Sequence, residues 1–318
     1  MKKVLVTEPI HADGLALLEK HVEVVLGKGT TTEEIIEQAK GCHGILIRSA
    51  KIPKEVIEAT STLEVVGKHG IGVDNIDVQY ATSKDVMVVN APESNVNAVA
   101  EHALALIFEV SKNLRMLDEQ VRQDNFKSRS SVVNVELSGK TVGLVGLGKI
   151  SSLLAGKLIA LGMTVVAYDP FVDAEVANKM GVSLLTLDDL LKTSDIVSLH
   201  VPLNEHTKWM IGKEQFDLMK KGAFLINVAR GPVVDETALY DALKNRAIRG
   251  AGIDVFEMEP PQADNQLFEL GNITMSPHNA ALTDEALIAM ATHSAQGIVD
   301  CLAGKTPQYV VNQDVLNK

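Results

Sequence analysis

One stretch of the chain decides the fold: Gly143-Leu144-Val145-Gly146-Leu147-Gly148-Lys149-Ile150-Ser151. It joins an apolar, strand-like run to a segment whose apolar positions 150, 153, 154, 158 and 161 share one face of a helix. Gly146 allows a tight turn, and Gly148 lets a pyrophosphate approach the backbone at the helix N-terminus. Ser151 stands where the dinucleotide-binding fingerprint has a third glycine, which leaves the packing of helix on strand open at this turn.

A carboxylate follows the next strand-like run, Val165-Val166-Ala167-Tyr168. This residue, Asp169, lies 169 − 151 = 18 residues beyond the third fingerprint position. A carboxylate at this point accepts the ribose hydroxyls of an adenosine and repels a 2′-phosphate. The following Pro170-Phe171-Val172-Asp173 offers no Arg to a 2′-phosphate, so we expect NAD rather than NADP. The alternative interpretation of Asp169 is a turn residue before proline.

Composition limits the class of protein. A chain of 318 residues, 46% hydrophobic and 22% charged, corresponds to about two globular domains. The net charge of 30 − 41 = −11, without a Lys/Arg cluster larger than pairs such as Lys220-Lys221, predicts no nucleic-acid or membrane partner. The N-terminal apolar run is too short for a signal or a membrane span, so we expect a cytoplasmic protein. Cys42 and Cys301 have no metal-binding spacing, so we expect two packed thiols and no metal.

Short runs rich in Val and Ile alternate with helical stretches in two successive series, which is typical of βαβ units. The first series predicts strands at 4–6, 22–26, 45–47, 65–66 and 86–89, and helices that begin near Asp13, Thr32 and Pro53. Thr31 and Glu34 predict a capping box. A helix over 94 to about 117 and the polar segment 123–131 form the expected hinge. The second series predicts strands at 141–145, 164–167, 196–199, 223–228, 251–255 and 273–275, helices at 150–161, 213–219 and 237–244, and an amphipathic helix over 283–302.

Polar or glycine residues follow the apolar runs at their carboxyl ends. In open α/β sheets, that edge binds the ligands, although loops are polar in any case. The residues at these positions include Arg48-Ser49, His69-Gly70, Asn90, Gly146-Leu147-Gly148, Asp169, His200, Arg230, Asp254 and His278.

Three side chains, Arg230, His278 and Glu259, suit hydride transfer, which needs a group to bind an acid and a group to exchange a proton. Arg230 follows a fully apolar run, and its planar fork can hold an α-keto carboxylate. His278 is the candidate acid/base because an imidazole titrates near neutral pH, and Glu259 can stabilise its protonated ring. Each has a plain alternative: a surface Arg, a hydrogen-bonded histidine and an acidic loop residue.

With these three residues, the chain resembles the D-isomer-specific 2-hydroxyacid dehydrogenases over essentially its whole length. The matching motifs are the fingerprint, Asp169, Gly70-Ile71-Gly72-Val73-Asp74-Asn75-Ile76-Asp77, Asn97-Ala98-Val99-Ala100-Glu101-His102, Leu199-His200-Val201-Pro202-Leu203, residues 227–231, Gly252-Ile253-Asp254-Val255-Phe256, and the segments around Glu259 and His278.

The resemblance implies two doubly wound parallel-sheet α/β domains flanking a cleft. A flavodoxin-like substrate domain covers 1–98 plus 287–318, and a Rossmann NAD-binding domain covers 99–286. Arg230, Glu259 and His278 are implied as the catalytic residues. The substrate contacts implied are Arg48, Ser49, Gly70, Asn97, Arg230 and His278, although Asn97 could equally be the N-cap of the long helix. The implied NAD contacts are Ile71, Gly146, Gly148, Lys149, Ile150, Asp169, His200, Val201, Pro202, Val228, Ala229, Arg230, Asp254, His278 and Ala280.

Within the family, the sequence is most similar to the D-3-phosphoglycerate dehydrogenase and hydroxypyruvate reductase branch. This implies an NAD-dependent enzyme of serine biosynthesis acting on 3-phosphoglycerate and 3-phosphohydroxypyruvate, and a homodimer formed through the NAD-binding domain. We expect Arg48 to meet a phosphate end, with Lys68 and His69 adding positive potential. Because the chain ends at Lys318, we expect no regulatory C-terminal domain and no feedback by serine.

Other functions stay open. Within the family, the chain can be a hydroxypyruvate, glyoxylate or general 2-keto acid reductase. From another class, an NAD-sensing corepressor of the same fold would bind NAD without turnover, but it has no need of all three catalytic residues. A methyltransferase would explain the glycine loop and Asp169 but neither Arg230 nor His278.

Overall fold

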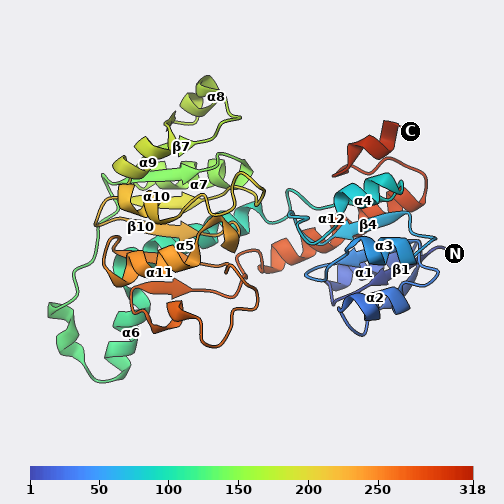
Figure 1. Cartoon of the computed structure of the whole chain (residues 1–318), viewed down its shortest axis with the longest axis horizontal. Coiled ribbons are helices and arrows are strands. Elements are labelled where there is room, and N and C mark those ends of the chain that lie inside the picture. Colours follow the sequence, from blue (N-terminus) through green and yellow to red (C-terminus); the bar gives the residue numbers. More distant parts are fainter. Residues whose placement is uncertain (318) are drawn as a thin grey trace. The chain divides into compact units, whose positions relative to one another are not determined.

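The computed structural model describes residues 1–317, so Lys318, the last residue of the predicted segment 287–318, lies outside the described residues. The described chain forms two compact units (Figure 1). The first contains Met1–Asn95 and the chain from Ala281 onward, and the second contains Val96–Ala280. None of the described helices combines the length and apolar character needed to cross a membrane.

The first unit is built on a sheet of five parallel strands in the order β2-β1-β3-β4-β5, the flavodoxin-like order. Its strands are β1 (Lys3–Val6), β2 (Glu23–Leu26), β3 (Gly44–Ile47), β4 (Val65–Lys68) and β5 (Met87–Val89). Its helices are α1 (Ala12–Glu19), α2 (Thr32–Gln38), α3 (Lys54–Ala59), α4 (Val78–Ser83), α12 (Asp284–Leu302) and the 3-10 helix η4 (Gln313–Asn317). The predicted capping box is confirmed, because the Thr31 side chain accepts the Glu34 N–H.

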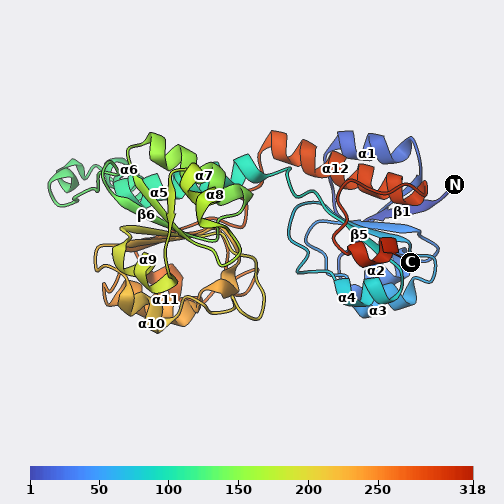
Figure 2. The same ribbon diagram turned by 90° about the horizontal axis from the view of Figure 1, so that it is seen from above.

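Helices cover both faces of this sheet, with α1 and α12 on one face and α2, α3 and α4 on the other (Figure 2). Strand β3 is buried on both faces, as a central parallel strand must be. Its alternation sends Ile45 and Ile47 into one apolar cluster with Ile35, and Leu46 into a second cluster with Ile298. The helix that follows residue 280 therefore completes the core of the N-terminal sheet.

The second unit contains seven parallel strands in the order β12-β11-β10-β9-β6-β7-β8. They are β6 (Thr141–Val145), β7 (Thr164–Tyr168), β8 (Val182–Leu184), β9 (Ile196–Leu199), β10 (Phe224–Asn227), β11 (Gly250–Ile253) and β12 (Ile273–Met275). Strand order reverses beside β6, which is the Rossmann arrangement. Ligands of such sheets bind at the carboxyl ends of the strands around this switch point.

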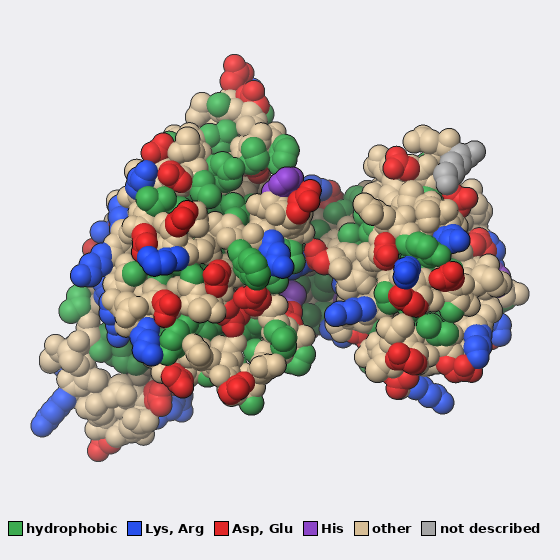
Figure 3. Space-filling view, viewed as in Figure 1, with side chains coloured by type: hydrophobic (Ala, Val, Ile, Leu, Met, Phe, Trp, Pro, Cys, Tyr) green, Lys and Arg blue, Asp and Glu red, His purple; other side chains and the backbone are tan. Residues whose placement is uncertain are grey.

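Helices of the second unit also form two layers. In Figure 2, α5 (Val96–Lys112), α7 (Lys149–Ala160) and α8 (Ala174–Lys179) lie on one face of the sheet, and α9 (Leu187–Thr193), α10 (Lys213–Leu218) and α11 (Glu236–Lys244) lie on the other. The remaining elements are α6 (Leu114–Arg122) and the 3-10 helices η1 (Phe126–Ser130), η2 (Gly231–Val233) and η3 (Gln266–Glu269). Acidic and basic side chains are mixed on the visible face of each unit (Figure 3).

The prediction of one continuous helix over 94–117 is wrong. Helix α5 ends at Lys112, and Asn113 has a left-handed backbone with φ of 52° before α6 begins. A residue in this conformation cannot continue a right-handed helix, so the chain turns there. The segment 123–131 lies inside the second unit, and the chain passes between the units at Asn95–Val96 instead.

Candidate functional site

The glycine loop is shaped by its neighbours. Gly146 has φ of 93°, and a Cβ added there would lie 3.0 Å from the His200 backbone and from Val201 Cγ1. Gly148 is the N-cap of α7, and a Cβ added there would meet nothing within 4 Å. The backbone thus turns tightly at the first glycine and leaves open space at the helix N-terminus, where a phosphate group fits.

Ser151, at the third fingerprint position, is fully buried. Its hydroxyl donates to the Gly148 carbonyl oxygen at 3.2 Å, within the first turn of α7. A buried hydroxyl with a hydrogen-bond partner costs little, so the helix packs on the sheet with serine in place of glycine. Lys149 and Ile150 open the same helix.

Asp169 lies directly against the glycine loop. Its Oδ2 accepts the N–H of Leu147 at 2.8 Å, and its Oδ1 accepts the N–H of Phe171 at 2.9 Å. The backbone of Gly146 also donates to the Tyr168 carbonyl at 2.8 Å. These bonds join the ends of β6 and β7, which is where a ribose and a pyrophosphate of one dinucleotide would meet.

The loop after β9 contains His200, Val201 and Pro202. Burial lowers the pKa of His200 to about 4, so its ring is neutral at pH 7. Its Nε2 lies 2.9 Å from the Ser198 hydroxyl. The His200 backbone and the Val201 side chain form the wall beside Gly146.

The loop that carries Arg230 is fixed by a buried amide. Asn227 is 2% exposed; its Oδ1 accepts the Ala229 N–H and its Nδ2 donates to the Arg230 carbonyl, both at 3.0 Å. The Arg230 guanidinium donates to the Ala229 carbonyl at 2.7 Å. A Cβ on Gly231 would lie 1.8 Å from the Phe256 carbonyl oxygen, so the loops after β10 and β11 pack backbone to backbone.

Glu259 and His278 form a direct pair. The Nδ1 of His278 lies 2.7 Å from Glu259 Oε2, and Glu259 Oε1 accepts the Phe256 N–H at 3.1 Å. Burial opposes ionisation of Glu259, but the hydrogen bond and charge of His278, the Phe256 N–H and the nearby Arg230 outweigh it and lower the pKa of the carboxyl. An ionised carboxylate only accepts, so Nδ1 carries the proton that is shared with Glu259, and Nε2 is the ring nitrogen outside this pair.

Asp254 holds the loop that carries His278. The carboxylate is 1% exposed; Oδ1 accepts the Asn279 N–H at 3.0 Å and Oδ2 accepts the Ala280 N–H at 2.9 Å. The Asp254 carbonyl accepts the His278 N–H at 2.7 Å. His278 itself has φ of 51°, an uncommon backbone for a non-glycine residue, which these bonds fix in place.

The first unit has its own switch point, between β1 and β3, and Glu8 fills it. Its carboxylate accepts the N–H groups of Arg48, Ser49 and Ala50 at 2.8 to 3.2 Å and the Ser49 hydroxyl. Burial opposes its ionisation, but the Ser49 hydroxyl and the three N–H groups outweigh it and lower the pKa of Glu8 to about 2. The Arg48 guanidinium donates to the Pro9 carbonyl at 3.0 Å.

The expected positive potential at the end of β4 comes from Lys68 and not from His69. Burial, together with the charges of Arg48 and Lys68, lowers the pKa of His69 to about 4, so this ring is neutral at pH 7. Lys68 Nζ donates to Asn75 Oδ1 at 3.0 Å and to the Arg48 carbonyl. The next residues, Gly70 and Ile71, continue the loop.

Asn97 is not the N-cap, because α5 begins one residue earlier, at Val96. Its side-chain amide donates to Glu101 Oε1 at 2.9 Å. The alternative interpretation of Asn97 as an N-cap is therefore wrong, and its predicted substrate contact stays a prediction.

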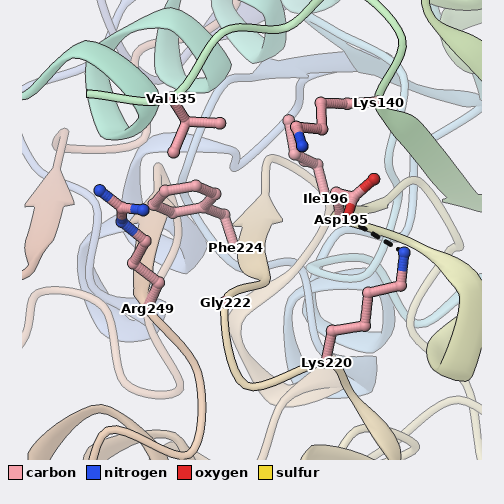
Figure 4. A pocket seen from close by; sticks show the side chains of 8 residues that line it. All are labelled: Val135, Lys140, Asp195, Ile196, Lys220, Gly222, Phe224 and Arg249. Carbon is pink, nitrogen blue, oxygen red and sulfur yellow. Dashed lines mark hydrogen bonds and ion pairs between the residues drawn. The ribbon is translucent and has the colours of Figure 1, made fainter. Parts of the chain in front are cut away.

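A cavity of about 320 Å³ lies at the opposite, amino edge of the second sheet (Figure 4). Lys140, Asp195 and Lys220 line it, and Lys220 donates to Asp195 at 3.0 Å. None of the predicted site residues is among those that line this cavity. The candidate site is instead at the carboxyl edge, where the loops after β6, β9, β10, β11 and β12 follow one another across the sheet.

Comparison with known proteins decides the family. The family model described as "D-isomer specific 2-hydroxyacid dehydrogenase, NAD binding domain" matches residues 104–280. The chain belongs to the D-isomer-specific 2-hydroxyacid dehydrogenase family. This match identifies the segment that carries Gly146, Asp169, Arg230 and His278 as an NAD-binding domain. The parallel sheet of each unit confirms the predicted α/β fold class.

Members of this dehydrogenase family are similar to this protein over nearly the whole chain. D-3-phosphoglycerate dehydrogenases of Methanocaldococcus jannaschii and Archaeoglobus fulgidus are 42% and 41% identical over 98% of the chain. The chain spans only about 60% of the length of these relatives. A D-lactate dehydrogenase of Aquifex aeolicus, solved with NAD and lactic acid, superposes with a TM-score of 0.89 at 29% identity and covers 98% of this chain and 99% of its own.

Proposed function

We propose that this chain reduces 2-keto acids to D-2-hydroxy acids with NADH, and that 3-phosphohydroxypyruvate is its preferred substrate. The observation that carries the proposal is the 2.7 Å pair between His278 and Glu259, with Arg230 close enough to lower the pKa of the same carboxyl. A proton donor, its carboxylate partner and a carboxylate-binding cation are the groups that this reaction requires.

The residues fit NAD. Open space at Gly148, the N-terminus of α7 and the Asp169 carboxylate would hold the pyrophosphate and the adenosine ribose. The carboxylate at Asp169 would disfavour a 2′-phosphate. NADH, when bound, supplies the hydride that the reduction needs.

Side chains of this protein bind the substrate carboxylate and supply the proton. Arg230 holds the substrate carboxylate through its planar fork, which orients C2 of the keto acid. His278 donates a proton from Nε2 to the substrate oxygen as negative charge develops there. Glu259, fixed by the Phe256 N–H, stabilises the protonated ring until that moment.

The phosphate preference rests on the first unit, which we propose to be the substrate domain. Arg48 is a second cation besides Arg230, and both its backbone and its guanidinium are held, by Glu8 and by the Pro9 carbonyl. Lys68 stands at the end of the neighbouring strand. A small apolar keto acid has no use for this second cation, whereas a phosphate group does. The names of the archaeal relatives agree with this choice.

Catalytic efficiencies for phosphohydroxypyruvate, hydroxypyruvate, glyoxylate and pyruvate, measured with NADH for wild type and Arg48→Ala, test the proposal. We expect the phosphorylated acid to have the highest efficiency and to lose most in the variant. Lys192→Ala, which changes an exposed lysine of α9, is the control. If pyruvate matches the phosphorylated acid, or if Arg48→Ala weakens all four equally, the chain is a general 2-keto acid reductase. Binding of NADH without turnover of any acid would favour the corepressor alternative.

We also propose a homodimer formed through the NAD-binding domain. The arm, residues 114–133, carries Leu114, Val121, Phe126 and Val133, each more than half exposed. In Figure 1, α6 lies away from the sheet of its own unit. Exposed apolar side chains of this kind are stabilised when a second copy covers them.

We further propose a cytoplasmic location. Cys42 and Cys301 are unpaired, and burial raises the pKa of both thiols, that of Cys301 to about 11. Two protonated, unpaired thiols suit a reducing compartment.

A further inference from the structure

A hydrogen-bonded chain leads from the His278 loop to the core of the second unit. The hydroxyl of Ser276 donates to Asp254 Oδ1 at 2.6 Å. The Nε2 of His102 lies 2.9 Å from the Ser276 hydroxyl oxygen and 3.5 Å from Asp254 Oδ1. The ring is one-quarter exposed, whereas Asp254 is 1% exposed.

The direction of these bonds is set by the donors available. A serine hydroxyl has one hydrogen, and Ser276 gives it to the carboxylate, which only accepts. Nε2 of His102 must therefore carry the proton that Ser276 accepts. His102 is thus the last donor in a chain that ends on Asp254.

A carboxylate with almost no exposure needs every partner it has. The groups that face Asp254 are the N–H groups of Asn279 and Ala280 and the Ser276 hydroxyl from the loop, and His102 from α5. Helix α5 packs on β10, β11 and β12, so it is a rigid support. The same carboxylate and its backbone fix the left-handed turn at His278.

We propose that His102 is a positioning residue for the proton donor: through Ser276 and Asp254 it fixes the loop that presents His278 to the substrate. The inference rests on the proposed function for its catalytic consequence. The geometry of the loop does not depend on that function, so the two can be tested apart.

Four variants test the proposal. His102→Leu removes the N–H, and His102→Gln keeps an N–H at similar reach. Ser276→Ala removes the hydroxyl, and the double variant combines it with His102→Leu. His206→Asn, on a fully exposed ring, is the matched control. The first readout is the ring Cε1–H resonance of His278, assigned with His278→Asn. The second readouts are kcat and KM for keto-acid reduction and the Kd of NADH.

We expect the His278 resonance to move in His102→Leu and Ser276→Ala, and to stay in His102→Gln and in the control. We expect kcat to fall about 10- to 100-fold in the first two variants, the loss that a small misplacement of a catalytic group produces, with little change in the NADH Kd. The double variant should be no slower than the slower single variant, because both act through one chain of bonds. If His102→Leu does not fold, the His278 resonance and kcat are compared between Ser276→Ala and His102→Gln instead.

An unmoved His278 resonance in Ser276→Ala and His102→Leu overturns the proposal, whatever the activity. Wild-type kcat in these variants, additive losses in the double variant, or a Gln variant no better than Leu also overturns it. A wild type that turns over no keto acid, while the resonance moves as expected, contradicts the proposed function and leaves the positioning role established.

Discussion

Glu8 holds two loops of the first unit together by its charge. Because its pKa is about 2 when folded and about 4.5 when free, its contribution to stability is fully present above pH 4.5 and is lost as the pH falls toward 2. After allowance for solvent screening, we expect this contribution to be on the order of 2 kcal/mol at pH 7.

Replacing Glu8 with Gln should therefore lower the free energy of unfolding at pH 7 by about that amount, and at pH 3 by roughly half as much or less. Urea unfolding of wild type and variant at both pH values measures the difference. A loss of the same size at both pH values would assign the effect to shape and not to charge. Glu33→Gln, on an exposed helix turn, is the control.

We propose that Glu259 sets the pH range of the proposed reduction. Reduction needs His278 protonated, and the ionised Glu259 stabilises that form at 2.7 Å. In Glu259→Gln the imidazole loses its charged hydrogen-bond partner, so we expect the pH profile of kcat/KM for reduction to move to lower pH. An unchanged profile would mean that the carboxylate does not act on the ring.

We propose that Asp169 determines coenzyme choice. Its carboxylate can accept two ribose hydroxyls and repels a 2′-phosphate, a difference on the order of a few kcal/mol. We expect kcat/KM with NADH to exceed that with NADPH at least about tenfold, and Asp169→Asn to narrow the ratio. Equal efficiency with both coenzymes in the wild type would contradict this role.

Long, regular elements were predictable from the sequence. Strong apolar runs predicted β1, β3, β6, β7 and β9, and the capping pair at Thr31 predicted the start of α2. The short elements α4, α8, α9 and β8 were missed, although elements of the same length, such as α10 and β12, were predicted. The break at Asn113 was missed because the apolar pattern continues across it.

The functional residues at strand ends were predictable from the sequence, but most of their hydrogen-bond partners were not. Arg230 and His278 follow apolar runs, and the Glu259–His278 contact expected from the sequence is present in the structure. Glu8 was missed, although its position after β1 was the available signal. The bonds from His102 to Ser276 join segments 174 residues apart, and spacing alone says nothing about such a contact.

A substitution in the arm, which contains α6 and η1, should weaken self-association. Phe126 is 65% exposed at the start of η1, and a charge there would oppose burial by a second copy. Phe126→Asp should shift the protein toward monomer in sedimentation equilibrium, while Phe171→Asp, on an exposed turn outside the arm, should not. A monomeric wild type, or a variant that associates as the wild type does, would remove the arm from the interface.

For the molecule as a whole, charge and fold agree with a small-molecule enzyme. The net charge of −11 is spread as mixed acidic and basic side chains on the visible faces, and two parallel sheets each present a switch point with polar loops. The chain spans about 60% of the length of its archaeal relatives, yet the matched part contains the glycine loop, Asp169 and the three proposed catalytic residues.

The proposed reaction depends on His278 as the proton donor. The most direct test is the rate of NADH oxidation with phosphohydroxypyruvate for wild type and His278→Asn, each at the NADH occupancy given by its measured Kd. We predict turnover by the wild type, an unchanged NADH Kd, and a rate that is roughly 10²- to 10⁴-fold lower in the variant. A variant as fast as the wild type, or a wild type that binds NADH and oxidises none of it with any keto acid, would contradict it.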